Sequence, residues 1–165
     1  MDLIVKPSGW LHQGEARYRC ALGRAGITTE KHEGDGATPA GHFPLRHLYY
    51  RADRIAALET GLPKSVITEN HGWCDDPACA SYNNLVRLPH AGSHEVLWRK
   101  DALYDAAVTI GHNYNPAVAG MGSAIFLHVA APGFTPTEGC IALDAADLIA
   151  VLVRCDVGTS ILITP

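Results

Sequence analysis

Hydrophobic residues in this chain occur in short runs of strand length, separated by turn signals rich in glycine and proline. The runs favour branched and aromatic side chains, which fit the pleated, half-buried surface of a β-sheet. The clearest runs are RYRCAL, HFPLRHLYY, LVRLP, AAVTI, AIFLHVA and SILIT. Between them stand turn-forming segments such as KPSG, EGDGATPAG, HGWCDDP and NYNP. This pattern predicts a mainly β fold.

One segment near the C-terminal end has a helical pattern instead. Asp144 is a good N-cap residue, and apolar residues recur after it at helical spacing, as at Leu148. We therefore expect a helix over residues 145–155. A weaker helix or turn is expected over DRIAALET, and a helical turn or an ordered loop over SHEVLWRKDALYD.

Length and composition indicate one globular domain. The chain has 165 residues, of which 47% are apolar and 18% charged, enough for one hydrophobic core. No break in composition divides it, so we expect a single domain over residues 1–165. The formal net charge of −4, without a basic block, argues against a nucleic-acid-binding face. No apolar run is long enough for a membrane span, and the oligomeric state is left open.

Five cysteines and nine histidines raise the question of a metal site or a disulfide. His71, Cys74, Asp75, Asp76 and Cys79 crowd one short segment. However, Cys-x4-Cys without a second pair at zinc spacing is poor evidence for a zinc site. We therefore expect neither a metal nor a cofactor. A Cys74–Cys79 disulfide is conceivable in an oxidising compartment, whereas a reducing one would keep both thiols free.

The segment PTEGCIAL places Cys140 directly after Gly139, and His128 lies at the end of the upstream run AIFLHVA. Elements joined by such a turn-rich connection can return side by side and bring the thiol and imidazole within reach. A nearby base would activate the thiol, and amides around Gly139 and Cys140 could donate to an oxyanion. The dipole of the helix after Asp144 would also favour a thiolate. From spacing alone, an inert buried cysteine and a structural histidine remain alternatives.

Three segments in order, GDGATPAGHFPL, GSAIFLHVA and PTEGCIAL, resemble the L,D-transpeptidase catalytic domain family of the YkuD type. That family shows a Gly-x-Thr-Pro-x-Gly-x-Phe segment, a histidine at the end of a strand and a [Ser/Thr]-His-Gly-Cys motif. The matching segments lie between Glu33 and Leu143, most of the chain. The resemblance implies a mainly β sandwich or barrel with one C-terminal helix and minor helical turns.

The resemblance also implies roles for individual residues. Cys140 matches the nucleophile, Gly139 the glycine before it, Thr137 the Ser/Thr of the motif, and His128 the upstream base. In this family a backbone carbonyl helps to orient the histidine, so no aspartate partner is required. Glu138 stands where the second histidine of the motif is expected, which indicates a divergent subgroup. Because a carboxylate beside a thiol raises its pKa, we expect Glu138 to point elsewhere or to contact substrate amines.

The implied chemistry is acyl transfer through a thioester, with peptidoglycan or muropeptide stem peptides as the partner. An amine from a second stem would resolve the thioester and give a cross-link, a reaction of cell-wall biogenesis and cell shape. Water would instead give an L,D-carboxypeptidase of peptidoglycan recycling. A non-catalytic peptidoglycan-binding domain is a third alternative. A cross-linking enzyme would work in the periplasm or cell envelope, whereas the lack of a signal peptide favours the cytoplasm if Met1 is the native start.

A peptide substrate with free amine and carboxylate groups needs polar contacts. Tyr82, Asn83 and Arg87 crowd a predicted loop that leads into a strand, and we expect them to bind substrate. His112 and Asn113 follow another predicted strand, and we expect them to line the same cleft. The alternatives are ordinary loop chemistry for the first group and an Asn-Pro turn for the second.

Overall fold

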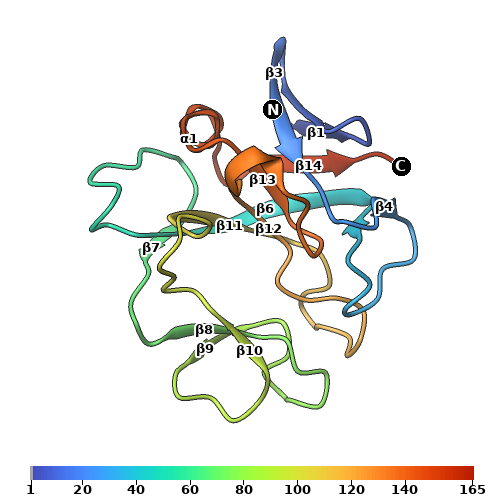
Figure 1. The fold of residues 1–165 in the computed structure, drawn as a ribbon, viewed down its shortest axis with the longest axis vertical. Coiled ribbons are helices and arrows are strands. Elements are labelled where there is room, and N and C mark those ends of the chain that lie inside the picture. Colours follow the sequence, from blue (N-terminus) through green and yellow to red (C-terminus); the bar gives the residue numbers. More distant parts are fainter. Residues whose placement is uncertain (1) are drawn as a thin grey trace.

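The structure is a computed structural model that describes residues 2–165, and within them the chain is built mostly of β-strands (Figure 1). One α-helix, α1 (Ala145–Leu152), and one 3₁₀ turn, η1 (Pro132–Phe134), are the helical elements of this range. The prediction of a mainly β fold with one C-terminal helix and minor helical turns is confirmed. The strands are β1 (Leu3–Lys6), β2 (Trp10–Gln13), β3 (Ala16–Ala21), β4 (Ile27–Thr28), β5 (Thr38–Pro39), β6 (Gly41–Tyr50), β7 (Lys64–Val66), β8 (His71–Cys74), β9 (Leu85–Arg87), β10 (His94–Val96), β11 (Ala106–Ile110), β12 (Phe126–Val129), β13 (Ile141–Leu143) and β14 (Ser160–Ile163).

The largest sheet closes into a barrel. Its nine strands follow the order β11-β12-β13-β3-β2-β1-β14-β6-β7, and β11 also pairs with β6. Strand β6 makes this closure because it is long enough to use both of its ends. Its first half pairs with β14, where Pro44 lies opposite Ser160, and its second half pairs with β11, where Leu48 lies opposite Val108. Closure leaves no unpaired edge between β6 and β11.

The barrel is filled by the inward-facing residues of its strands. Leu3 and Val5 of β1 and Ile161 and Ile163 of β14 are all at most 1% exposed. Successive side chains of a strand point to opposite faces, so the alternating pattern of each short run places one set of residues in this core.

Helix α1 begins where the sequence predicts. The Asp144 carboxylate accepts a hydrogen bond from Ala146 N at 2.9 Å, and Leu148 is buried in the barrel core. The helix ends at Leu152, earlier than predicted, because the Cys155 N–H bonds to Leu152 O three residues back and tightens the last turn. Within residues 2–165, no helix is both long and apolar enough to cross a membrane.

For the two weaker segments no helix forms, and the turn and ordered-loop alternatives are closer to the structure. The segment DRIAALET forms turns, in which Ile55 N donates to Arg51 O. The segment SHEVLWRKDALYD supplies β10 and then continues as turns that lead into β11. In both segments, side-chain contacts hold the backbone in place of a helical ladder. Arg54, for example, donates to Asp105 at 2.6 Å and to the carbonyl of Asp101 at 2.7 Å.

A separate three-stranded sheet, β10-β8-β9, lies away from the barrel strands (Figure 1). A second apolar cluster connects the two parts. Trp73 of β8 packs against Phe126 of β12, with ring centroids 5.2 Å apart, and Tyr104 packs against the same ring at 5.6 Å. Cys140 belongs to this cluster as well. The cysteine that the sequence singled out therefore lies where the small sheet meets the barrel.

Candidate active site

The backbone register brings His128 and Cys140 to the same face of the barrel sheet. Strands β12 and β13 are parallel neighbours, with Leu127 opposite Ile141 and His128 opposite Ala142. Cys140 directly precedes β13, two positions before Ala142, and positions two apart point to the same side of a strand. The predicted return of the two elements side by side is confirmed.

The Cys140 thiol is buried and hydrogen-bonded to the backbone. Its Sγ donates to Ala124 O at 3.1 Å and accepts from Phe126 N at 3.3 Å. Burial, with a smaller contribution from the carboxylate of Glu95, raises the pKa of Cys140 to about 12, while the Phe126 N–H and the charge of Lys31 oppose the rise. The resting thiol is therefore protonated at neutral pH, and it needs a base to become a nucleophile.

His128, the base expected from the sequence, lines the same cavity as the thiol. Its Nδ1 lies 2.8 Å from Val129 O, and a carbonyl can only accept, so Nδ1 carries the proton and Nε2 is the acceptor nitrogen of the neutral ring. The ring also packs edge-on against Tyr104, with centroids 5.3 Å apart. Burial lowers the pKa of His128 to about 4, so the resting imidazole is neutral and able to take a proton.

This buried neutral histidine is expected to make the protein less stable in acid. The pKa of His128 falls from its ordinary value of 6.5 to about 4 on folding, so the unfolded chain binds the proton more readily. The contribution of His128 to the free energy of unfolding is fully present above pH 6.5. It is lost as the pH falls towards 4, by about 3 kcal/mol in all. Urea unfolding at several pH values should show a smaller loss for His128→Asn than for the wild type. Identical losses in the two proteins would contradict this assignment.

Gly139 is required by the close packing of the turn before the nucleophile. Its φ is +143°, and a Cβ built there would lie 2.9 Å from Ala37 O and 3.3 Å from Ile125 Cδ1. Ala37 belongs to the segment GDGATPAG, whose Thr38 Oγ1 accepts from Gly23 N at 2.9 Å. The Gly-x-Thr-Pro segment thus supports the back of the cysteine turn.

Thr137 shapes the same turn through its hydroxyl. Its Oγ1 donates to Cys140 O at 2.6 Å and accepts from Gly139 N at 3.2 Å. The Gly139 N–H is therefore already used within the turn. Of the two predicted oxyanion donors, this leaves the amide of Cys140 as the candidate.

The two candidate catalytic residues open into one cavity of about 630 Å³. Segments far apart in the sequence build its wall: β10 with the turns that follow it, strand β12, and the loop before β13. Glu95 lies at the junction of these walls and accepts a hydrogen bond from the Tyr104 hydroxyl. Burial raises the pKa of Glu95, while the bond from Tyr104 opposes that rise. The residues that line the cavity are His94, Glu95, Val96, Arg99, Leu103, Tyr104, His128, Ala131, Thr135, Pro136, Thr137, Glu138 and Cys140.

Glu95, and not Glu138, is the carboxylate that opposes the thiolate. The Glu138 side chain is 76% exposed and accepts from Arg24 Nε at 3.0 and 3.1 Å, and it does not contribute to the raised pKa of Cys140. Glu138 therefore points away from the sulfur, one of the two arrangements expected from the sequence.

Replacing Glu95 with glutamine is expected to make Cys140 more reactive. Removal of the buried charge lowers the pKa of Cys140 and increases the thiolate fraction, so alkylation by iodoacetamide at pH 8–9 should become several-fold faster. Peptide mass spectrometry over time would measure the rate at Cys140. Glu138→Gln is the matched control, since that carboxylate is exposed and paired with Arg24, and should leave the rate unchanged. Equal alkylation rates of Cys140 in the wild type and in Glu95→Gln would contradict this prediction.

Asn83, predicted to bind substrate, is instead a structural support of the site. It is 8% exposed, and its Oδ1 accepts from Trp73 Nε1 and from Ala124 N, both at 3.0 Å. Its Nδ2 donates to Asn113 O at 2.7 Å. Since Ala124 O accepts from the Cys140 thiol, Asn83 holds the peptide that orients the sulfur.

The other predicted substrate contacts lie outside the cavity, and the structure corrects their placement. The Tyr82 hydroxyl donates to Glu33 and accepts from Gly122 N at 3.1 Å, inside the protein. Arg87 lies on β9 and lines a different hollow, with Thr68, Asn70, His71, Leu85 and Val86. The local sequence places these side chains near polar neighbours, but neither residue lines the cavity that contains Cys140.

His112 and Asn113 are also absent from the cavity walls. His112 Nε2 contacts Met121 O at 2.8 Å, in a hollow lined by residues 28–32. The Asn113 side chain closes its own loop, donating to Val118 O and Gly122 O at 2.9 Å each. The turn interpretation of this segment is therefore the better one, because both side chains are used to hold the loop.

The helix dipole cannot act on the thiol as expected. Strand β13 separates Cys140 from the N-cap Asp144, and its three extended residues span roughly 10 Å. The field of a helix end falls off within its first turn. The protonation of Cys140 is therefore governed by burial, Glu95 and Lys31.

The sequence did not indicate the cavity residues that come from β10 and from the turns after it. Glu95, Arg99 and Tyr104 all lie in SHEVLWRKDALYD, and all three line the cavity. The signal that could have identified them is the mixture of charged and aromatic residues in this segment, whose hydrophobic residues follow neither the helical nor the strand period.

Comparison with known proteins gives one family match. The YkuD family, described as the L,D-transpeptidase catalytic domain, matches residues 8–163. No curated protein matches significantly. Similar solved structures are L,D-transpeptidase 1 from Mycobacterium tuberculosis (13% identity, TM-score 0.45, 99% of this chain and 58% of that one) and L,D-transpeptidase 3 from the same organism in complex with a faropenem-derived adduct (14%, 0.48, 99% and 60%). An L,D-transpeptidase from Mycobacterium smegmatis is a third (15%, 0.45, 99% and 58%), so this chain spans about three fifths of the length of these structures.

Proposed function

The chain belongs to the L,D-transpeptidase catalytic domain family, and we propose that it cross-links peptidoglycan stem peptides by cysteine-dependent acyl transfer. The family acts on peptidoglycan. The proposed donor is a stem peptide cleaved at the carbonyl of an L-configured centre, most simply that of diaminopimelate. The proposed acceptor is an amine of a second stem.

One observation carries this proposal. Cys140 and His128 lie on the same face of two adjacent parallel strands, and both line one cavity. A buried thiol with a neutral imidazole beside it is the arrangement that nucleophilic catalysis requires. Two other buried thiols, Cys20 and Cys155, belong to the barrel core and do not line this cavity. Cys20 lines a different hollow, which has no histidine in its wall.

In the first half-reaction, His128 Nε2 takes the thiol proton as the Cys140 sulfur bonds to the carbonyl carbon. The carbonyl oxygen becomes an oxyanion, for which the amide of Cys140 is the proposed donor. The intermediate then collapses, the carbon–nitrogen bond breaks, and the imidazolium gives its proton to the departing amine of the D-amino acid. A thioester with a neutral His128 remains.

In the second half-reaction, His128 takes a proton from the acceptor amine as its nitrogen attacks the thioester. The carbon–sulfur bond breaks, and the sulfur leaves as a thiolate that recovers the proton from the imidazolium. Attack by water in place of the amine would give carboxypeptidase action with the same residues.

The charges around the cavity support a zwitterionic peptide as substrate. The Arg99 guanidinium lines the cavity and is held by Asp101, with Nε and Nη2 at 2.8 and 2.7 Å from its oxygens. We assign it to a carboxylate of the stem peptide. Glu95, buried deeper in the same cavity, is assigned to an amine.

Incubation with purified disaccharide-tetrapeptide muropeptides, followed by mass spectrometry, tests the proposal. Cross-linked dimers that appear with the wild type and not with Cys140→Ala would support transpeptidation. Monomers that lose one terminal residue, without dimers, would identify an L,D-carboxypeptidase instead. Binding of muropeptides without any product would leave only a binding domain, and would overturn the proposed reaction.

A further inference from the structure

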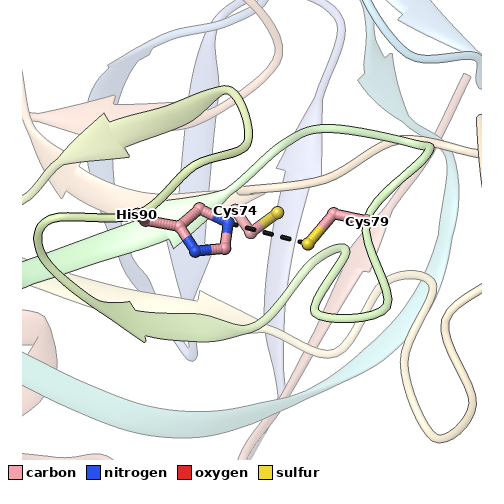
Figure 2. A group of neighbouring side chains, drawn as sticks. All are labelled: Cys74, Cys79 and His90. Atoms are coloured by element: carbon pink, nitrogen blue, oxygen red, sulfur yellow. Dashed lines mark hydrogen bonds between the residues drawn. The ribbon is translucent and has the colours of Figure 1, made fainter.

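A second cluster of reactive side chains lies in the small sheet, apart from the cavity. Cys74 ends β8, Cys79 lies in the following loop, and His90 lies in the loop between β9 and β10. One ligand atom from each, the two Sγ atoms and a ring nitrogen, lie within 4.8 Å of one another. Figure 2 shows the three side chains converging from these separate segments, with Cys79 and His90 in contact.

The spacing of these atoms fits a common metal ion. Cys79 Sγ and His90 Nε2 are 3.6 Å apart. Two ligands at the usual zinc–sulfur and zinc–nitrogen lengths and a tetrahedral angle would be about 3.5 Å apart. The cluster therefore needs little movement to close around an ion.

The backbone around the cluster is already arranged for thiolates. The Ser81 N–H donates to Cys79 Sγ at 3.4 Å. Such N–H donors stabilise the negative sulfur of a metal ligand. All five cysteines are free in the structure.

Asp76 is a candidate for the fourth ligand. A Cβ built on Gly92 would lie 3.0 Å from Asp76 Oδ2 and 3.1 Å from His90 Nε2, so the carboxylate and the imidazole approach the same point. Asp76 Oδ1 accepts from Ala78 N at 2.9 Å, which holds this carboxylate in the loop. Either water or Asp76 would complete a tetrahedron.

We propose that Cys74, Cys79 and His90 bind a zinc ion that fastens the small sheet. Two sulfur ligands and one imidazole favour zinc over calcium or magnesium, which prefer oxygen. The ion would tie the end of β8 to both neighbouring loops. Strand β10 pairs with β8, with His94 opposite Cys74, and β10 supplies Glu95 to the cavity, so the ion would steady one wall of the active site.

This proposal replaces the expectation from spacing that the chain binds no metal. The sequence grouped His71 and Asp75 with the cysteines, whereas His71 Nδ1 accepts from Thr68 N at 3.2 Å and Asp75 accepts from Ser93 Oγ at 2.6 Å. The third ligand, His90, comes from beyond β9 and reaches the cysteines only because the β8–β9 hairpin folds back.

Metal content of the purified full chain, prepared under reducing conditions, tests the site directly. Plasma mass spectrometry is expected to find about one zinc per chain. Replacement by Co²⁺ in the apo protein should give a thiolate-to-cobalt charge-transfer band. Cys79→Ser and His90→Ala should each weaken zinc binding by about 100-fold or more, measured by competition with a chromophoric chelator. Neither change removes a fully buried side chain, since Cys79 and His90 are part-exposed.

Cys20→Ser and His12→Ala are the matched controls, because they remove a thiol and an imidazole from the barrel strands β3 and β2. Both should keep zinc and the cobalt band. The proposal is overturned if the wild type binds no zinc, or if Cys79→Ser binds it as tightly as the wild type. It also fails if the protein purified without reductant holds a Cys74–Cys79 disulfide and cannot bind zinc after reduction. Metal content is read without substrate, so these outcomes are independent of the acyl-transfer assay.

Discussion

Replacing Cys140 with alanine is expected to abolish acyl transfer, lowering the rate on muropeptides by at least about 10³-fold. The reason is that Cys140 carries the one thiol among the residues that line the cavity, so without it no thioester can form. The effect on stability should be small, since the sulfur makes two hydrogen bonds to the backbone, one with Ala124 and one with Phe126. Intact-mass spectrometry after exposure to a carbapenem checks the covalent step, because an acyl adduct should form on the wild type only.

Cys20→Ala is the appropriate control for that experiment. Cys20 is as buried as Cys140, and burial raises its pKa to about 12 as well, but it lies in the barrel core without a base beside it. The control should keep the adduct and the activity. An adduct that persists in Cys140→Ala, or one that disappears in Cys20→Ala, would show that the nucleophile is assigned to the wrong residue.

Replacing His128 with asparagine is expected to lower kcat/KM by about 10²- to 10⁴-fold, the usual effect of losing a general base. Asparagine can still donate to Val129 O, so the strand and its register should be kept. The Cys140 thiol would stay protonated, because burial holds its pKa near 12 and no base would remain to take the proton. The rate of the variant should therefore rise with pH more steeply than that of the wild type, up to the limit of its stability.

His12→Asn, a half-buried position on β2 in the same barrel, is the matched control and should keep wild-type rates. If His128→Asn lost less than a few-fold in kcat/KM, or if its pH profile matched the wild type, His128 would be a packing residue and the base would have to be sought elsewhere in the cavity.

The family and the candidate catalytic pair could be predicted from the sequence because both predictions depend on local patterns. The three segments that resemble the L,D-transpeptidase family are confirmed as evidence of membership by the family match over residues 8–163. The run that ends near His128 and the turn-rich connection to Cys140 predict two elements that can return side by side, and the register of β12 and β13 in the structure brings them together. With that register known, alternation of side chains places His128 and Cys140 on one face.

The substrate contacts were less accessible, and Asn83 illustrates why. In the sequence, Asn83 is one of several polar residues in a predicted loop, and this pattern indicates a substrate-binding residue. In the fold, its side chain bonds to Trp73, ten residues away, and to Asn113 and Ala124, which lie 30 and 41 residues further along the chain. A polar side chain satisfies whatever groups the tertiary structure brings near it, and buried groups must be paired. Local sequence cannot distinguish such a support from a substrate contact.

By itself, the sequence determined the mainly β fold, the start of the C-terminal helix and the pair of Cys140 and His128, since each follows from periodicity, capping or a short motif. Only the tertiary structure decided that Glu95 faces the thiol and that His90 joins Cys74 and Cys79. These contacts depend on how the small sheet folds back on itself and packs on the barrel, an arrangement set by long-range burial of aromatic side chains such as Trp73 and Phe126. Burial of this kind acts between segments that no local pattern connects.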